Sequence, residues 1–345
     1  MNQCMRKKNV LFICGSANQT TQMMSIADEM KGVECYFTPY YADGLLRHAA
    51  ESGLLDFTIL GGEFQKKSLS LLYQSQRLID WRGESRIYDL VVTCSDLIIP
   101  HNIRSTAIVL VQEGMTDPEN MVYHLVKKLH LPRYIASTSM TGLSDAYVAF
   151  CVASDEYKSL FVKKGVKQEK IVVTGIPNFD NCLMYCNNSF PYRNFVLAAT
   201  SDTRETFRYE NRKQFIRKVI TIAQGRDIIF KLHPNEQGVR ARREIEKLCP
   251  NAIIYHEGNA HDMIANCDVL ITKFSTLVYT GIALGKEVYS DFPIHELRKL
   301  LPIQNGGTSA AAIARVCEQS MNGIGLHKIK HREKVSVRPL VYSKV

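Results

Sequence analysis

Short runs of Val, Ile and Leu alternate with longer amphipathic stretches along most of the 345-residue chain. The apolar runs show little strict alternation with polar residues, which is typical of strands buried on both faces of a parallel sheet. The stretches between them have the spacing of amphipathic helices. Because parallel strands need crossover connections, this alternation predicts an α/β chain built from successive βα units.

Two series of such units can be distinguished. In the first, the spacing predicts helices over residues 22–32, closed by Gly32, and 155–165, and strands within residues 9–16, 33–40, 56–62, 88–96, 107–114, 146–154 and 170–178. In the second, it predicts strands within residues 194–202, 227–235, 252–258, 268–275 and 287–292, with helices over 209–225, 238–248, 261–267 and 276–286. A βαβαβ order of this kind indicates doubly wound domains.

We therefore expect two tandem Rossmann-like domains with a ligand cleft between them, since a chain of this length exceeds a typical single core. The predicted N-terminal domain covers residues 1–181, and a polar linker containing Pro191 covers 182–193. The predicted C-terminal domain covers 194–325, and a basic tail covers 326–345.

The formal net charge of +9 indicates anionic partners such as nucleotides, acidic glycans or an anionic membrane surface. Basic and aromatic residues are not interleaved as in nucleic-acid-binding proteins, so no nucleic-acid partner is expected. No apolar run approaches the ~18 residues of a membrane span, and the N-terminal apolar run lacks a signal-peptide cleavage site. The ten cysteines are scattered and mostly lie in apolar segments. We expect a cytoplasmic protein that can rest on the inner face of the membrane.

Polar residues follow three predicted strands of the second series. Lys231, His233 and Pro234 follow the first, Glu257 and Gly258 the second, and Ser275 and Thr276 the third. Ligands of open α/β sheets bind at the carboxyl ends of strands, and a helix N-terminus after Ser275 would favour phosphate. Each residue also has a structural explanation: Ser275 as an N-cap and His233 as a core histidine. Together they predict a phosphate site, although neither a P-loop nor a G-x-G-x-x-G fingerprint is present.

Three segments carry a family resemblance: Val172 to Asn181, Lys231 to Pro234, and Cys267 to Val288. They resemble bacterial glycosyltransferases of the GT-B fold with an "HP" motif and a Ser/Thr motif, such as sialyltransferases, capsule Kdo transferases and CDP-glycerol glycerophosphotransferases. The resemblance implies that His233, Ser275 and Thr276 bind the phosphate and ribose of a cytidine nucleotide donor. It also implies a glycan or lipid-linked acceptor of the bacterial surface.

The same resemblance extends to the segment Leu110 to Asp117, which is similar to an acidic-acidic-Gly motif that carries a general base. Gln112 replaces the first acid, so Glu113 is the implied base and Asp117 is the second candidate for that role. Glycosyl transfer needs such a carboxylate to accept the proton of the attacking hydroxyl. Gly15, Ser16 and Asn178 are also placed in the cleft. No Asp-x-Asp motif lies near these loops, so we expect metal-independent chemistry without a cofactor.

Two alternatives stay open. Non-hydrolysing UDP-N-acetylglucosamine 2-epimerases share a similar "VTGNP…D" segment and "A-L-G-K" helix end, but their "GTRPE" loop is replaced here by "CGSANQT", and Thr280 stands where they place a glutamate. The second alternative is a non-catalytic nucleotide- or glycan-binding protein, which Gln112 in place of an acid would suit. Residues in surface βα loops, such as Glu113, can also lack any chemical role.

Overall fold

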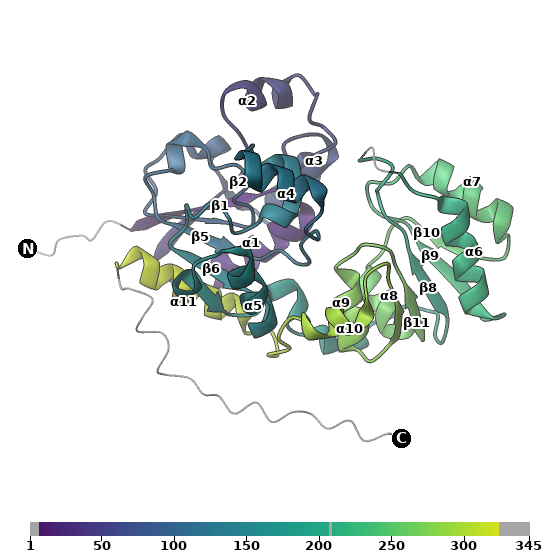
Figure 1. The fold of residues 1–345 in the computed structure, drawn as a ribbon. Coiled ribbons are helices and arrows are strands. Elements are labelled where there is room, and N and C mark those ends of the chain that lie inside the picture. Colours follow the sequence, from purple (N-terminus) through teal and green to yellow (C-terminus); the bar gives the residue numbers. More distant parts are fainter. Residues whose placement is uncertain (1–6, 207–208, 324–345) are drawn as a thin grey trace, which may run out of the picture.

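A computed structural model describes residues 7–206 and 209–323. It contains two parallel β-sheets, each covered by helices on both faces, in two Rossmann-like units that lie side by side (Figure 1). The strand order is β3-β2-β1-β4-β5-β6-β7 in the first sheet and β10-β9-β8-β11-β12 in the second. The predicted α/β class and tandem arrangement are therefore confirmed.

In both units the strands are short and the helices follow them in crossover positions. The first unit contains β1 (Lys8–Cys14), α1 (Ala17–Glu29), β2 (Val33–Pro39), α2 (Gly44–Glu51), α3 (Gly62–Gln74), β3 (Leu78–Ile79), β4 (Leu90–Thr93), β5 (Ile108–Val111), α4 (Met121–Leu129), β6 (Ala149–Val152), α5 (Asp155–Lys164) and β7 (Ile171–Val173). The second contains β8 (Val196–Ala199), α6 (Arg212–Ala223), β9 (Ile228–Lys231), α7 (Gly238–Leu248), β10 (Ile253–Tyr255), α8 (Ala260–Asn266), β11 (Val269–Ile271), α9 (Leu277–Ala283), β12 (Glu287–Tyr289) and α10 (Ile294–Lys299). The last helix is α11 (Ser309–Met321), and 3₁₀ segments include η3 (Arg133–Met140) and η6 (Cys182–Cys186).

Strand β1 shows why the apolar runs lack alternation. Its Val10, Phe12 and Cys14 pack on one face of the sheet, with α1 and α11, whereas Leu11 and Ile13 pack on the other face. Both sets are almost fully buried. A strand covered by helices on both faces has no side that favours polar residues.

Two local predictions were wrong. Residues 56–62 form turns that lead into α3 rather than a strand, because Gly61 and Gly62 end the apolar run and Gly62 takes a left-handed φ of +55°. The third strand of this region is the two-residue β3 at the edge of the sheet. Helix α1 begins at Ala17, five residues before the predicted start, because Ser16 caps it; it ends at Glu29, so Gly32 does not close it.

The chain returns to the first unit at its last described helix. Buried residues of α11, including Ile313 and Cys317, join the core formed by α1 and the first sheet, and Figure 1 shows α11 (yellow) beside that sheet. The predicted C-terminal range 194–325 therefore does not describe the second unit alone, because the core of α11 is that of the first sheet. We propose that α11 belongs to the first unit. The predicted tail 326–345 lies outside the described residues.

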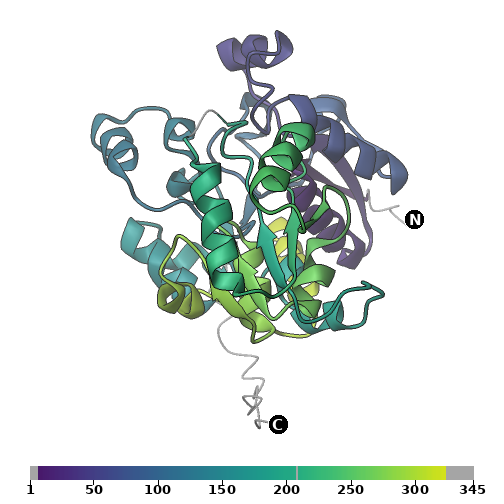
Figure 2. The ribbon, with the colours of Figure 1, turned by 90° about the vertical axis from the view of Figure 1, so that its right-hand side faces the viewer.

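The two units are in direct contact. Tyr157 of α5 and Tyr279 of α9 meet through their hydroxyl groups at 2.5 Å in a buried position. Val278, Tyr279 and Leu297 of the second unit also join a hydrophobic cluster of the first. In the view of Figure 2 the second unit lies in front of the first. Among the described residues, no helix is long and apolar enough to span a membrane.

Candidate active site between the two units

A cleft of about 860 Å³ lies where the carboxyl ends of both sheets face each other. The loops after β1 and β5 supply one wall, and those after β8, β9, β10 and β11 supply the other. Eight predicted site residues line it: Ser16, Glu113, Lys231, His233, Pro234, Gly258, Ser275 and Thr276. The sheet topology thus brings together residues that are up to 260 positions apart, from Ser16 to Thr276.

Glu113 is held by the start of α1. Its carboxylate accepts hydrogen bonds from the Ser16 hydroxyl (2.9 Å), the Gln19 side-chain amide (2.6 Å) and the Asn18 side-chain amide (3.4 Å). Ser16 also accepts from the backbone N–H of Gln19 as the N-cap of α1. These neutral donors fix the carboxylate in the cleft and bring no positive charge into contact with it, which suits a group that must accept a proton.

Gln112, which replaces the expected acid, has a structural role. It is 1% exposed. Its side-chain amide donates to the Gly114 carbonyl (2.8 Å) and accepts from the backbone N–H of Ala153 (2.9 Å). A carboxylate here would lose the donor to Gly114 and bury a charge. The glutamine therefore orients the loop that carries Glu113 without reaching the cleft.

Gly114 of the first unit lies close to Thr276 of the second. A Cβ atom at Gly114 would lie 2.8 Å from Thr276 Cγ2 and 2.9 Å from Thr276 Oγ1. Only glycine allows this separation. The residue after the predicted base thus touches one of the predicted phosphate-binding hydroxyl residues.

His233 is presented to the cleft as a neutral donor. Its Nδ1 accepts from the backbone N–H of Asn235 (3.2 Å), which places the ring proton on Nε2. Burial lowers the pKa of His233, against the opposing effect of Asp202, whose carboxylate lies 3.6 Å from Nδ1. The His233 backbone N–H donates to Thr200 Oγ1 (3.0 Å), which fixes the loop after β9. The Nε2–H group remains as a donor toward a ligand.

Two lysines organise the same loop. Lys231 is buried, and its ammonium donates to the carbonyls of Leu232 (2.8 Å) and His256 (2.9 Å), joining the ends of β9 and β10. Burial lowers the pKa of Lys231. Lys67 of α3 reaches across from the first unit and donates to the Pro234 carbonyl (3.1 Å) and Asn235 Oδ1 (2.9 Å). Both add positive charge beside His233.

At the third loop, Ser275 Oγ accepts from the backbone N–H of Leu277 (3.3 Å), and Thr276 occupies the N-cap position of α9. Ser275 thus accepts the side-chain hydrogen bond expected of an N-cap, while Thr276 occupies the N-cap position without making one. Helix α9 has only seven residues, and the hydroxyl-bearing residues Ser275 and Thr276 both line the cleft at its start.

Four predicted residues do not line the cleft. Asp117 accepts from the Thr138 hydroxyl (2.8 Å) and lines two other hollows instead of the cleft. Glu257 is exposed and is not among the residues that line the cleft. Gly15 and Asn178 lie behind the wall: Gly15 donates its N–H to Gln19 (2.9 Å), and Asn178 donates to the Asn18 carbonyl (2.8 Å). These last two residues support the groups that hold Glu113.

The structure adds His261, which the sequence analysis assigned only to a helix. Its ring stacks on Tyr185 with centroids 4.5 Å apart, and its Nδ1 lies 2.9 Å from Thr280 Oγ1. Burial lowers its pKa to about 4, so the imidazole is neutral at pH 7. Thr280 is fully buried and does not line the cleft, whereas His261 does. His261 stands three residues after Gly258 of "HEG", in the loop that follows a predicted strand end, and this was the signal that could have identified it.

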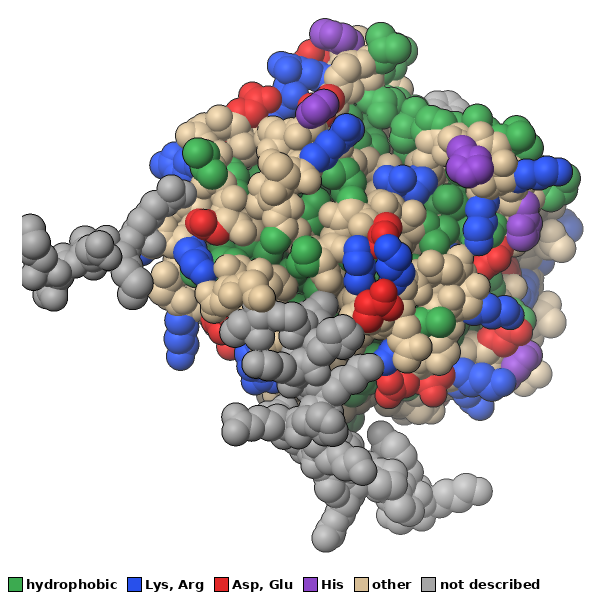
Figure 3. Space-filling model, turned by 60° about the vertical axis from the view of Figure 1, so that its left-hand side comes forward, with side chains coloured by type: hydrophobic (Ala, Val, Ile, Leu, Met, Phe, Trp, Pro, Cys, Tyr) green, Lys and Arg blue, Asp and Glu red, His purple; other side chains and the backbone are tan. Residues whose placement is uncertain are grey.

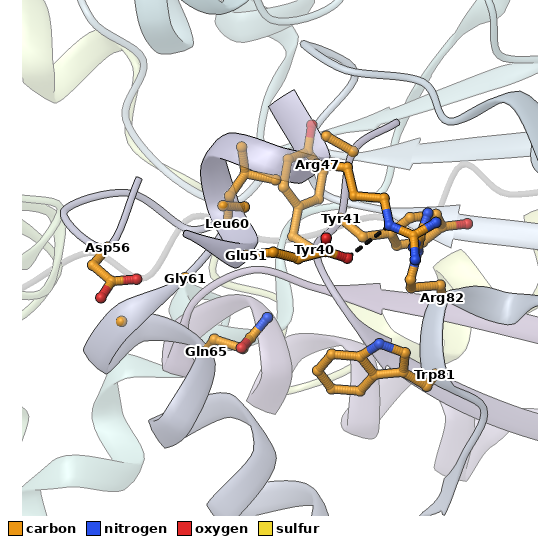
Figure 4. Close-up of a pocket in the computed structure, with 13 residues that line it drawn as sticks. Tyr40, Tyr41, Arg47, Glu51, Asp56, Leu60, Gly61, Gln65, Trp81 and Arg82 are labelled. Atoms are coloured by element: carbon orange, nitrogen blue, oxygen red, sulfur yellow. Dashed lines mark hydrogen bonds and ion pairs between the residues drawn. The ribbon is translucent and has the colours of Figure 1, made fainter. Parts of the chain in front are cut away.

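A smaller pocket of about 150 Å³ lies at the same edge of the first sheet, beyond the Gly61–Gly62 turn. Tyr40 and Tyr41 follow β2, and Trp81 and Arg82 follow β3, while Arg47 pairs with Glu51 of α2 at 2.7 Å (Figure 4). Aromatic faces beside charged side chains are suited to a small polar ligand.

Within residues 7–206 and 209–323, no group of three or more His, Cys, Asp and Glu residues is arranged to hold a metal ion. The cleft places a carboxylate on one wall and neutral or cationic donors on the other. This arrangement can accept a proton at one end and stabilise phosphate charge at the other.

No protein-family model matches the chain, and no curated protein is detectably similar to it in sequence. Solved structures do match. UDP-GlcNAc 2-epimerase from Neisseria meningitidis, bound to UDP-GlcNAc, is 11% identical with a TM-score of 0.55, over 90% of this chain and 100% of that one. Staphylococcus aureus MnaA with UDP is 14% identical (TM-score 0.52; 92% and 91% covered), and the Methanocaldococcus jannaschii UDP-GlcNAc 2-epimerase with UDP-GlcNAc and UDP is 12% identical (0.51; 90% and 99%).

This chain has the GT-B fold. The match spans both units, so the expectation of a GT-B arrangement is confirmed. In a GT-B chain, the cleft between the two Rossmann-like units is where the strand ends of both sheets meet, and Glu113 and His233 line it here from opposite walls.

Proposed function

We propose that this protein is a glycosyltransferase that uses a nucleotide-sugar donor. The observation that supports it best is the cleft itself: Glu113 stands on one wall, and His233, Ser275 and Thr276 stand on the other. Ligand sites occur preferentially between domains and at the carboxyl ends of parallel strands. Ser16 and Gln19 hold the Glu113 carboxylate in a fixed orientation at the cleft, as proton transfer requires.

In the proposed step, Glu113 accepts the proton of an acceptor hydroxyl as that oxygen attacks the anomeric carbon of the donor sugar. The bond between the anomeric carbon and the phosphate oxygen breaks, and the electron pair leaves with the nucleotide. His233 Nε2–H and the hydroxyl groups of Ser275 and Thr276 would donate to the departing phosphate. Donors placed where charge develops lower the barrier, and Lys67 adds positive charge nearby.

The proposed donor is a nucleotide sugar, with a cytidine nucleotide favoured by the motif resemblance. The three structural neighbours were solved with UDP or UDP-GlcNAc, so uridine donors are the direct competitor. The proposed acceptor is a glycan or lipid-linked sugar at the cytoplasmic face of the membrane. The pocket beside Trp81, at the same sheet edge as the cleft, is its proposed position.

A thermal-shift panel of CMP, CDP, UDP, UMP, GDP and ADP tests the donor site. A ligand that binds the folded state stabilises it by ~2.7 kcal/mol at a hundredfold excess over Kd. We expect stabilisation by cytidine nucleotides that His233→Ala removes. Stabilisation by uridine nucleotides would move the donor class to UDP, and no stabilisation by any of the six would contradict the proposed site.

An epimerase is the second candidate, because two of these structural neighbours carry that activity. Incubation with UDP-GlcNAc separates the two. An epimerase forms the 2-epimer without any acceptor, whereas a transferase releases nucleotide and depends on an acceptor. Gln112 gives no support to a non-catalytic alternative, because its amide is fully engaged in holding the loop.

A further inference from the structure

The segment from α4 to η3 exposes an unusual number of large apolar side chains. Its α4–η3 patch consists of Met121 (88% exposed), Val122 (43%), Leu125 (51%), Leu129 (56%), Leu131 (36%), Tyr134 (40%) and Ile135 (48%). Contiguous exposed apolar surface of this kind usually marks an interaction site.

The sequence spacing explains why these residues face outward. Tyr123 and Val126 of α4 are buried in a small cluster with Ala136 and Met140. Met121, Leu125 and Leu129 recur every four residues and lie on another face of the helix. The inward face is therefore already satisfied, and Met121, Leu125 and Leu129 are left between 51% and 88% exposed.

The charge around the patch identifies its partner. Residues 119–136 contain Lys127, Lys128 and Arg133 and a single acid, Glu119. Protein interfaces are depleted in lysine, whereas elements that lie in a membrane interface combine Leu and aromatic residues with Lys and Arg. Figure 3 shows one face of the molecule, on which hydrophobic side chains reach the surface among charged residues of both signs and His.

A groove next to the patch extends this character. It encloses about 480 Å³ and is lined by Leu97, Ile98 and Tyr134 together with Arg104 and Arg133. The Nε atom of Arg133 is buried and has no hydrogen-bond partner, while its Nη2 donates to the Asp96 carbonyl (3.1 Å). Apolar walls with two guanidinium groups suit a lipid, with its chains against the leucines and its phosphate at the arginines.

We propose that the α4–η3 patch docks on an anionic phospholipid surface. The location has a consequence for the cleft, which rests on the proposed function. Val122 and Ile135 border a second hollow of about 480 Å³ whose opposite side is Lys273 and Phe274, immediately before Ser275. Docking would therefore bring the side of the active-site cleft to the bilayer, where a lipid-linked acceptor is found.

Cosedimentation with vesicles tests the proposal on the full chain. Vesicles of phosphatidylglycerol and phosphatidylcholine are compared with pure phosphatidylcholine at ~0.15 M salt, where charges are screened beyond ~8 Å. We expect binding only to the anionic vesicles, and a loss of roughly tenfold or more for each leucine in Leu125→Gln/Leu129→Gln. Leu183→Gln is the matched control, because Leu183 is also 56% exposed but lies in η6. Lys128→Glu should lower the affinity for anionic vesicles, and salt should then reduce that affinity less than it does in the unmodified chain.

Three results would overturn the proposal: no binding by the unmodified chain, binding that survives in the double variant, or a dimer that the double variant dissociates. The last would make the patch a self-association surface. The nucleotide panel is repeated on the double variant. Because vesicle binding needs no nucleotide, the docking proposal and the donor-site proposal fail independently.

Discussion

Replacing Glu113 by Gln should abolish transfer while leaving the donor site intact. The change keeps the side chain's size and one acceptor oxygen, and removes the group that takes the acceptor's proton. Positioned general bases contribute about 10²–10⁴ in rate, so we expect turnover to fall by that factor. This corresponds to about 3–5 kcal/mol in the activation barrier.

The hydrogen bonds of Glu113 determine how much Glu113→Gln changes the stability of the folded protein. An amide can still accept from Gln19, and its NH2 can donate to the Ser16 hydroxyl oxygen, so only the weak 3.4 Å contact from Asn18 is lost. The stability change should stay within about 1 kcal/mol. Asp117→Asn is the matched control, since this carboxylate lies outside the cleft and binds Thr138; it should leave turnover unchanged.

The assay measures nucleotide release from the donor that the thermal-shift panel identifies, with and without acceptor, alongside the nucleotide-induced stabilisation of each variant. Reduced turnover with normal stabilisation supports the base assignment. Unchanged turnover in Glu113→Gln, or an equal loss in Asp117→Asn, would refute it.

Three further outcomes are expected. His233→Ala should weaken nucleotide affinity about 10–100-fold, because it removes a hydrogen-bond donor to the phosphate. His256 is an exposed histidine outside the cleft, so His256→Ala should bind nucleotide normally. Equal affinities of the two variants in isothermal titration would mean that His233 has only a structural role. Gly114→Ala should lower turnover, because its Cβ would meet Thr276 at 2.8 Å, and Thr276→Ser should restore part of it in the double variant. Because burial lowers the pKa of His261 to about 4, the unfolded chain binds more protons between that value and about 6.5; stability from this group is complete above pH 6.5 and is lost as the pH falls. Urea unfolding should therefore show a smaller loss of stability, by about 2–3 kcal/mol, in His261→Gln than in the unmodified chain, and equal losses would contradict this.

Local sequence patterns predicted most of the strands and helices. Strand β1 and strand β9 were predictable because a strand buried on both faces must be apolar throughout. Helix α7 was predicted over the observed range, since its amphipathic period is regular. The turn at residues 56–62 was misread because a packed loop also buries apolar side chains, and a short apolar run does not distinguish the two.

Residues that end neighbouring parallel strands could also be predicted to meet. Lys231, Gly258 and Ser275 line one wall because a parallel sheet places every carboxyl end at the same edge. Glu113 and Asp117 were not separable in this way. They lie four positions apart in one loop, and only the path of that loop directs one into the cleft and the other toward Thr138.

The sequence by itself determined the βα units, their grouping into two sheets and the strand ends that carry polar groups, because each of these depends on neighbours along the chain. The tertiary structure alone decided that Gly114 touches Thr276, that Lys67 reaches Pro234, that α11 returns to the first sheet and that His261 enters the cleft. Such contacts join residues far apart in sequence. They depend on how two finished units pack, and no local period records that packing.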